Sequence, residues 1–299
     1  MKKRLPVILA AIALAGCTQR GTAPVAQVPA SAPARPTLDP EAQAALADSP
    51  EIALNPSEPE SGSLRVRRRW LYYVRGGAIT TVRSASRNMV SDLIQQAGGV
   101  AGLNGAFFSD ARVAGRGNKM IGPLLTGVGA EFAPVDPSDA PRCVGRPLVV
   151  IGPRAIAFAP YALWMGDSEA SIRRLMPDAT DAFLAGGWLV HNGIPQTEEE
   201  IRARCVADAQ DYRRRAFMGV DDRGRLILGA TDYSIDSARL AKSLEPLHIR
   251  EAVLLDCGFS TSLVWQGRIL VSGHSRKSMP SRPVPHALVI MAPAIGGRT

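Results

Sequence analysis

Four short segments place small, polar or charged residues at the ends of apolar runs, where side chains from different strands can meet. The most informative is Leu254–Ser262, in which an apolar run ends in Asp256, a turn of small residues and three hydroxyls. This layout can aim a carboxylate and several donors into one pocket, although the same hydroxyls could satisfy a tight turn. We expect Asp256, Gly258, Ser260 and Thr261 to form part of a site.

The other three segments offer groups that such a carboxylate could work with. Asn104 precedes Gly105 and two phenylalanines, which fits either a hairpin turn or a polar side chain at a strand end. Gly186 and Gly187 interrupt a strand, as glycines do at a bulge or where a ligand approaches the backbone. Arg215 enters an apolar strand, where its planar guanidinium can pair with a buried acid or bind phosphate.

Short apolar runs separated by glycine and proline outnumber the helical segments, so we expect an α+β fold. Helices are predicted at Ser86–Gln96, Ser168–Met176, Glu198–Val206 and Ile235–Leu244, the last with Ser234 as its N-cap. Strands and helices do not alternate regularly, which argues against a doubly wound parallel sheet. We predict a single domain over residues 64–299 with a large, mostly antiparallel or mixed sheet and a few helices.

Residues 1–16 are typical of a bacterial export signal. Three basic residues precede the apolar run Leu5–Ala15, which is too short to span a bilayer. The run closes on Leu-Ala-Gly-Cys, which resembles a lipobox, the motif in which Cys17 is acylated and becomes the mature N-terminus. A lipid on Cys17 would hold the protein on a membrane of the cell envelope, outside the cytoplasm.

Residues 17–63 are predicted to form a disordered tether behind Cys17. They hold eight of the 23 prolines and no aromatic residue, so they cannot bury enough surface to offset the entropy of ordering. A short helix over Glu41–Ala47 would have nothing obvious to pack against.

The positive charge belongs to the globular part of the chain. The leader contributes three positive charges and residues 17–63 a net of four negative ones, so the net charge of +8 leaves +9 for residues 64–299. Arginine runs at Arg67–Arg69 and Arg213–Arg215 favour an anionic glycan, a sugar phosphodiester or a membrane surface as partner. Nucleic acid is disfavoured by the export signal and by the lack of a basic-aromatic motif.

Three cysteines remain besides Cys17, and an odd number in an oxidising compartment leaves at least one outside a disulfide. Cys143 and Cys205 are the pair that the sequence suggests, because both lie in loop-like or helical sequence, and Cys257 lies in the motif around Asp256. Sequence alone does not fix this connectivity.

In this order, the four segments resemble the phosphodiester glycosidase family. Its Asn-Gly-x-Phe-Phe stretch matches residues 104–108, and its Gly-Gly pair matches Gly186 and Gly187. Its Arg-Thr-Ala strand is matched by Arg215, with Ala216 in the threonine place. The resemblance spans roughly residues 65–292.

The strongest signature of the family, Leu-Asp-Gly-Gly-Gly-Ser-Ser-Thr, is matched at Leu255, Asp256, Gly258 and Ser260, with Thr261 and Ser262 as conservative exchanges. A closing Arg-x-Val-x-Asn resembles residues 282–286, with His286 in the asparagine place.

The resemblance implies an envelope hydrolase that cleaves a sugar-1-phosphodiester or a related phosphoglycan. Asp256 would act as base, nucleophile or metal ligand, and Arg215 would hold the phosphate with Ser260, Thr261 and Arg282. Substrate binding would also involve Asn104 on sugar hydroxyls, the two strand glycines Gly186 and Gly187, Gly258 and His286. A second carboxylate is expected at Asp232 or Glu131, and a divalent cation beside Asp256 stays open because no ligand spacing demonstrates one.

Other interpretations follow from the departures. Cys257 and Phe259 replace two signature glycines, which favours an envelope lipoprotein that binds glycan or cell-wall polymer through a degenerate site. Cys257 with His274 or His286 could form a thiol nucleophile pair. A serine hydrolase elbow at Ser260 lacks its final glycine and its following helix.

Overall fold

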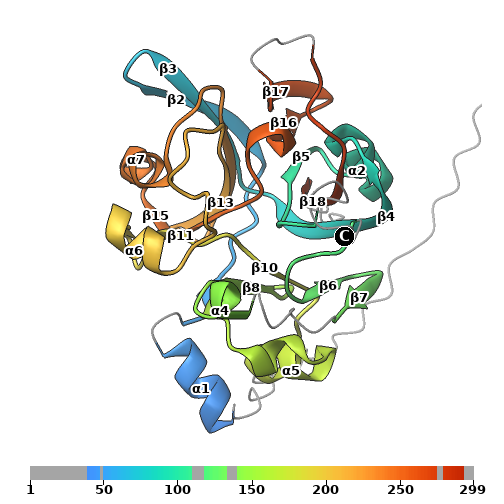
Figure 1. The fold of residues 1–299 in the computed structure, drawn as a ribbon. Helices are drawn as coiled ribbons and strands as arrows, with labels where there is room; N and C mark the ends of the chain where they lie inside the picture. Colours follow the sequence, from blue (N-terminus) through green and yellow to red (C-terminus); the bar gives the residue numbers. More distant parts are fainter. Residues whose placement is uncertain (1–38, 48–49, 110–117, 133–139, 275–278, 293–299) are drawn as a thin grey trace, which may run out of the picture. The chain divides into compact units, whose positions relative to one another are not determined.

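The structure is a computed structural model that describes residues 39–47, 50–109, 118–132, 140–274 and 279–292 (Figure 1). In these ranges the strands form three sheets of seven, five and six strands, and every strand pairing is antiparallel. The α+β fold expected from the sequence is confirmed. The strands are divided among three sheets rather than gathered into one.

The seven-stranded sheet contains two strands that are buried over their whole length. Every residue of β13 and β14 is buried, because side chains cover both faces of the sheet. Its order is β12 (Ile194–Pro195), β11 (Trp188–His191), β15 (Ile249–Leu254), β13 (Ala216–Asp221), β14 (Leu226–Thr231), β3 (Arg69–Arg75) and β2 (Glu60–Val66).

The other two sheets complete the core. The five-stranded sheet runs β17 (Arg268–Ser272), β16 (Ser262–Trp265), β5 (Ala101–Asn104), β18 (Val284–Met291) and β4 (Ala78–Asn88). The six-stranded sheet runs β1 (Ile52–Ala53), β9 (Ala155–Pro160), β8 (Pro147–Ile151), β10 (Asp181–Leu184), β6 (Leu124–Thr126) and β7 (Gly129–Glu131). One apolar cluster includes residues of all three sheets, so they pack around a shared core.

The helices agree with the sequence in place but not always in extent. They are α1 (Pro40–Leu46), α2 (Val90–Ala97), α4 (Ala140–Cys143), α5 (Glu169–Leu175), α6 (Glu198–Ala203) and α7 (Ser237–Ser243), with short 3-10 turns at η1 (Leu163–Gly166), η2 (Glu245–Leu247) and η3 (Gly258–Ser260). The predicted helix over Ser86–Gln96 begins too early, because β4 continues to Asn88 along β18. Helix α7 is capped by Asp236, whose Oδ1 accepts from the Arg239 N–H (2.8 Å), and not by Ser234.

The folded region begins before residue 64, so the predicted tether is too long. Helix α1 packs against β9 and α5, and the β2 strand starts at Glu60. Arg174 holds the start of α1 by donating to Asp39 (2.7 Å) and to Glu41 (2.8 Å). The partner that the sequence did not reveal for this helix therefore comes from more than 130 residues further along the chain.

Two further observations bear on the sequence interpretation. No disulfide joins Cys143 to Cys205, and Cys257 is likewise a thiol in the structure, so the suggested pairing is wrong. Within the described ranges, no helix is long and apolar enough to cross a membrane. Cys17 and the leader lie outside the described residues.

Candidate active site

Asp256 lies where the seven-stranded sheet meets the five-stranded one, two residues after β15 ends. Its backbone N–H donates to the carbonyl of Gly105, just beyond β5 (3.1 Å). The N–H of Leu255 donates to the carbonyl of Ala216 on β13 (2.9 Å). The segment is thus held by strands of both sheets, and Asp256 is buried.

Both oxygens of the Asp256 carboxylate accept hydrogen bonds. Oδ1 accepts from the Cys257 N–H (2.9 Å) and Oδ2 from Nη2 of Arg282 (3.2 Å). Burial raises the pKa of Asp256, and Arg282 and Ser260 oppose that shift. A carboxyl group whose pKa is raised can exchange a proton closer to neutral pH, which suits acid–base chemistry.

Arg282 links the carboxylate to the surface. Its Nε donates to Oγ of Ser260 (2.7 Å), and its guanidinium lies over the ring of Phe108, 4.9 Å from the centroid. Its side chain is 33% exposed, whereas that of Asp256 is 11% exposed. Arg282 is therefore the cation that both contacts Asp256 and remains accessible to an anionic substrate.

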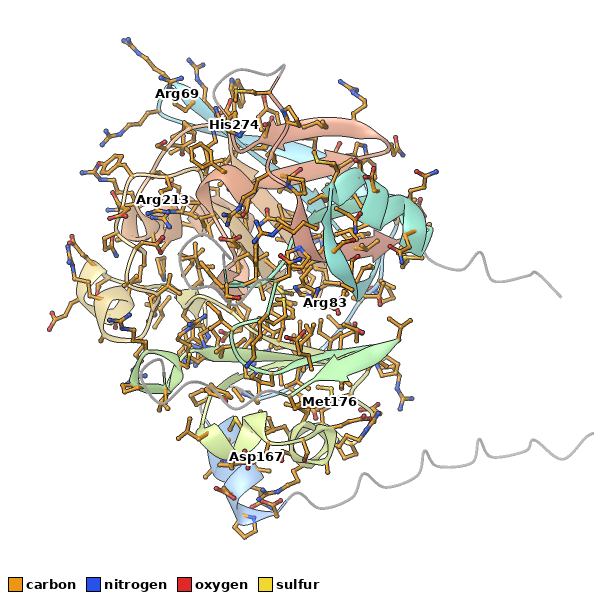
Figure 2. All side chains as sticks on the ribbon, turned by 45° about the vertical axis from the view of Figure 1, so that its right-hand side comes forward. Arg69, Arg83, Asp167, Met176, Arg213 and His274 are labelled. Carbon is orange, nitrogen blue, oxygen red and sulfur yellow. The ribbon has the colours of Figure 1, made fainter. Side chains whose placement is uncertain are left out.

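Two arginines of β4 extend this cationic region, and the sequence analysis missed both. Arg87, like Arg282, lies over the Phe108 ring, with its guanidinium 5.0 Å from the ring centroid. Its Nε donates to Oδ1 of Asn118 (2.5 Å). Arg83, labelled in Figure 2, donates to the Asn118 carbonyl (2.9 Å) and pairs with Glu131 (3.1 Å). Both contact Asn118, but the register of β4 against β18 is irregular between Arg83 and Asn88, and the sequence predicted a helix from Ser86 onward.

Asn104 joins the two sheets instead of facing a ligand. Its side chain is fully buried, its Nδ2 donates to the Asp256 carbonyl (2.6 Å), and its Oδ1 accepts from the Ser262 N–H (3.0 Å). Both ends of the amide are engaged with the backbone of the catalytic segment. The structure therefore supports a positioning role for Asn104, not the expected contact with sugar hydroxyls.

Gly105 is required because His286 lies directly against it. A Cβ at Gly105 would come within 2.1 Å of Nδ1 of His286, so no side chain fits there. The same Nδ1 accepts from the Ala106 N–H (3.0 Å), and the His286 ring packs edge-on against Phe183 (5.6 Å). His286 is 1% exposed and fixes the backbone after Asn104, so it does not reach a substrate here.

The imidazole of His286 is neutral at physiological pH. Burial, together with the nearby Arg83 cation, lowers its pKa to about 3. Because Nδ1 accepts a hydrogen bond, the proton of the neutral ring resides on Nε2, which is buried and has no hydrogen-bond partner in the described chain.

The η3 turn presents the motif that follows Asp256. Gly258 has φ of 65°, a left-handed conformation that side chains disfavour. Ser260 and Thr261 are fully buried, and Thr261 Oγ1 donates to the Arg214 carbonyl (3.2 Å). Phe259 is 63% exposed and stacks on His274 (4.8 Å), so the bulkiest departure from the family signature points outward.

Arg215 does not form the expected phosphate clamp. Its side chain is fully buried, with Nε donating to the Ile235 carbonyl (3.0 Å) and Nη2 to the carbonyls of Asp208 (3.1 Å), Ala209 (2.8 Å) and Asp211. These bonds tie the chain before β13 to the chain after β14. Arg215 therefore crosslinks two segments of the fold. Of the two arginines that the sequence predicted to bind the phosphate, Arg282 is the one that lies beside Asp256.

The two strand glycines serve packing as well. A Cβ at Gly186 would approach the Phe107 ring within 2.6 Å, and one at Gly187 would approach Sγ of Cys205 within 2.3 Å. Because these two glycines have no side chain, the Phe107 ring and the Cys205 thiol can approach the strand. The space that the glycines leave is therefore filled by protein atoms and not by a ligand.

The two candidate second carboxylates lie in different surroundings. Glu131 belongs to the Arg83–Asn118 network beside the site, and its Oε1 also accepts from the Met120 N–H (3.1 Å). Asp232 lines a separate groove with Arg214. Glu131 is the better candidate. Across the described ranges, no cluster of three or more His, Cys, Asp or Glu side chains could hold a metal ion.

The thiol nucleophile hypothesis finds no support in the geometry. Sγ of Cys257 donates to the Leu255 carbonyl (3.0 Å), and burial raises the pKa of Cys257 to about 11, with Arg215 opposing the shift. His286 contacts Ala106 and His274 stacks on Phe259, so both rings have other neighbours. A thiol that resists ionisation is a poor nucleophile.

The comparisons with known proteins agree with the resemblance seen in the sequence. Residues 156–291 match the model of the phosphodiester glycosidase family, a range that includes Arg215, Asp256, Arg282 and His286. The resemblance to this family is confirmed over that part of the chain. None of the curated proteins matches the sequence.

Three solved structures share the fold. The catalytic domain of zebrafish N-acetylglucosamine-1-phosphodiester alpha-N-acetylglucosaminidase, auto-inhibited by its pro-peptide, is 15% identical, with 82% of this chain and 89% of that chain covered and a TM-score of 0.62. A hypothetical protein from Synechocystis is 13% identical (82% and 64% covered, TM-score 0.51). A putative exported protein from Burkholderia pseudomallei is 14% identical (75% and 74% covered, TM-score 0.51).

The buried neutral His286 predicts a specific loss of stability in acid. In the unfolded chain His286 is protonated below its ordinary pKa near 6.5, whereas in the folded chain it is protonated only near pH 3. The free energy of unfolding therefore falls as the pH falls through this window, because the unfolded state binds the extra proton. Between pH 7 and pH 4.5 this term amounts to about 2–3 kcal/mol of the free energy of unfolding. Urea titrations at both pH values should show a smaller loss for His286→Asn than for the wild type.

His248→Asn is the matched control, because His248 is exposed and its φ of 52° suits asparagine. Equal acid sensitivity of His286→Asn and the wild type would show that His286 is not the group that titrates.

Proposed function

We propose that this chain, whose residues 156–291 match the phosphodiester glycosidase family, is a cell-envelope hydrolase that cleaves the bond between a sugar and the phosphate of a sugar-1-phosphodiester. The observation that carries the proposal is the contact between the buried Asp256 carboxylate and the half-exposed Arg282, held together with Ser260 at the junction of two sheets. This arrangement places one acid and one accessible cation where the reaction requires opposite charges.

The chemistry needs a negative group at the sugar and positive groups at the phosphate. As the bond from the anomeric carbon to the phosphate oxygen lengthens, positive charge develops on the sugar and negative charge on the departing phosphate. Arg282 can present its guanidinium to the phosphate while it still donates to Ser260 and Asp256. Arg87, which also lies over the Phe108 ring, adds positive charge near Arg282.

Asp256 is the group that faces the sugar. Its carboxylate stabilises the positive anomeric carbon, either by attacking it or by taking a proton from the attacking water. Overall, the water oxygen bonds to the anomeric carbon, the carbon–oxygen bond to phosphate breaks, and a phosphate monoester departs. Phosphate leaves as a stable anion, so the reaction does not depend on a strong general acid.

A second function is favoured by one observation. Cys257 and Phe259 stand where the family signature has glycines, and an envelope lipoprotein that only binds glycan would tolerate such changes. A saturable association with sugar phosphodiesters without any hydrolysis would favour this binding function over the enzyme.

The cellular location belongs to the proposal as well. Cys17 follows an export-type leader and a lipobox-like sequence, so acylation there would place the hydrolase on a membrane outside the cytoplasm. Substrates in the cell envelope, such as phosphoglycans, would then be within reach.

Asp256→Asn should abolish most of the hydrolysis without weakening the fold. Asparagine keeps an oxygen for the Cys257 N–H but carries no negative charge, so kcat should fall by about 10²–10⁴. The assay measures sugar released from a panel of sugar-1-phosphodiesters, together with the melting temperature. Asp232→Asn, in the separate groove, is the control and should retain activity. Full activity of Asp256→Asn would exclude this carboxylate from the mechanism.

Arg282→Lys and Arg215→Lys should fail in different ways. Lysine at position 282 loses the planar fork on Ser260, Asp256 and the phosphate, so KM should rise by about tenfold at nearly unchanged stability. Lysine at position 215 loses several bonds to buried carbonyls, so the unfolding free energy should fall by about 1–3 kcal/mol while KM stays the same. The reverse pattern would return the phosphate role to Arg215.

Cys17→Ser should release the protein from membranes, because serine offers no thiol for acylation. Fractionation of cells that produce the wild type and the variant, with Cys205→Ser as the control, measures this. Membrane association that survives Cys17→Ser would refute the lipid anchor.

A further inference from the structure

A groove of about 980 Å³ lies beside the η3 turn and has no lining residue in common with the Asp256–Arg282 pair. We call it the cationic groove and define it by its charged lining residues, Arg67, Arg69, Arg214, Asp232, Arg239 and Lys242. The carbonyl of the lining residue Arg214 accepts from the Gly258 N–H (2.9 Å), so the groove lies next to the η3 turn that follows Asp256.

The two arginine runs noticed in the sequence meet in this groove. Arg67 and Arg69 come from the turn between β2 and β3, and Arg214 comes from the segment before β13, about 145 residues further along. Figure 2 labels Arg69 and His274, two residues that line the groove. Folding therefore brings together charges that are far apart in sequence.

The positive charge in the groove is poorly compensated. Five Arg or Lys side chains line it against the single carboxylate of Asp232. Burial lowers the pKa of Arg214; Asp232 opposes this shift and the neighbouring Arg69 cation adds to it. Among the described residues, Arg239 also pairs with a second acid, Asp236, at 3.3 Å. A cleft lined by one sign of charge attracts ligands of the opposite sign.

Arg214 is also fixed in place, which favours a specific site over a diffuse charged surface. Its Nη1 donates to the carbonyl of Ser272 at the end of β17 (2.6 Å). The neighbouring arginines of the same run point elsewhere: Arg213 pairs with Asp208 (3.0 Å) and Asp211 (2.9 Å), and Arg215 is in the core.

Tyrosines supply the uncharged part of the lining. Tyr72, Tyr212 and Tyr233 all line the groove, and the Tyr212 ring lies under the Arg239 guanidinium (5.3 Å). The hydroxyl of Tyr233 is buried and has no hydrogen-bond partner in the described chain. Burial raises the pKa of Tyr233 to about 12, so this hydroxyl stays protonated and can donate. Tyrosine combines a flat apolar face with a polar tip, as ligands with both rings and hydroxyls require.

The shape of the groove selects among anionic partners. Its volume falls in the range of cavities that enclose a ligand of several rings, and exceeds what one phosphate ion would fill. A membrane surface would instead need an apolar face that protrudes into the lipid. The charges here line a concave surface, with tyrosines between them.

We propose that the cationic groove binds a glycan chain that carries several phosphate groups, at a site separate from Asp256. The arginines and Lys242 would pair with the phosphates, and the tyrosines would contact the sugar rings. The groove would thus retain the protein on a phosphorylated polymer whether or not Asp256 hydrolyses it.

The test is direct binding of a fluorescent phosphorylated oligodextran, with the unphosphorylated oligodextran as the ligand control. The variant is Arg69→Gln/Lys242→Gln, since both side chains are exposed and their loss should not disturb the fold. The matched control is Arg142→Gln/Arg154→Gln, which removes the same charge from exposed positions outside the groove. Fluorescence anisotropy of the purified full chain measures the dissociation constant.

We expect the phosphorylated ligand to bind, the plain one not to bind, and the groove variant to lose about tenfold in affinity while the control variant matches the wild type. Asp256→Asn should bind as the wild type does, so a failure of hydrolysis leaves this result standing. Equal weakening by both double variants, or no binding by the wild type, would overturn the proposal. The proposal would also be overturned if inorganic phosphate fully displaced the phosphorylated oligodextran. It would likewise be overturned if the protein bound phosphatidylglycerol vesicles but not the oligodextran, and the groove variant lost that vesicle binding.

Discussion

The candidate active site depends on the crosslink that the Asn104 side chain makes between two sheets. Its amide donates to the carbonyl of Asp256 and accepts from the N–H of Ser262, and both bonds are buried. Unmet backbone groups at such depth would cost about 1–3 kcal/mol each, so the segment between them has little freedom to move. Because the carboxylate belongs to that segment, its position relative to Arg282 follows from this one side chain.

The surroundings of Asn104 serve the same purpose. Gly105 allows the His286 ring to approach the backbone, and His286 in turn holds the N–H of Ala106. Arg215 fixes the chain that leads into β13, which pairs with β15, the strand that precedes Asp256. Many of the family-like residues therefore shape the backbone, and few contact solvent. The side chains that remain accessible, Arg282 above all, are those that a substrate can meet.

The distribution of arginine separates two surfaces around the η3 turn. On one, Arg282 and Arg87 both lie over the Phe108 ring, and Arg282 contacts Asp256. On the other, the cationic groove gathers charge from the β2–β3 turn, helix α7 and Arg214. A protein that acts on a phosphorylated polymer needs both kinds of surface, one to hold the chain and one to act on a single bond. The η3 turn lies next to both the Asp256–Arg282 pair and the cationic groove, so one element can position both surfaces.

The sequence by itself determined the α+β class and the family resemblance, and it singled out Asp256 as the candidate carboxylate, because apolar runs and a short motif are local properties that need no long-range contact. It did not determine which arginine contacts that carboxylate, because nothing in the sequence distinguishes Arg215 from Arg282 in this respect. In the folded protein Arg215 is buried in the core and Arg282 is partly exposed. Nor did it show that α1 is folded, since the residues that hold it, such as Arg174, are remote in sequence. The convergence of Arg69 and Arg214 on one groove has the same cause. Side-chain direction and long-range contact depend on how the sheets pack together, and only the tertiary structure decides that.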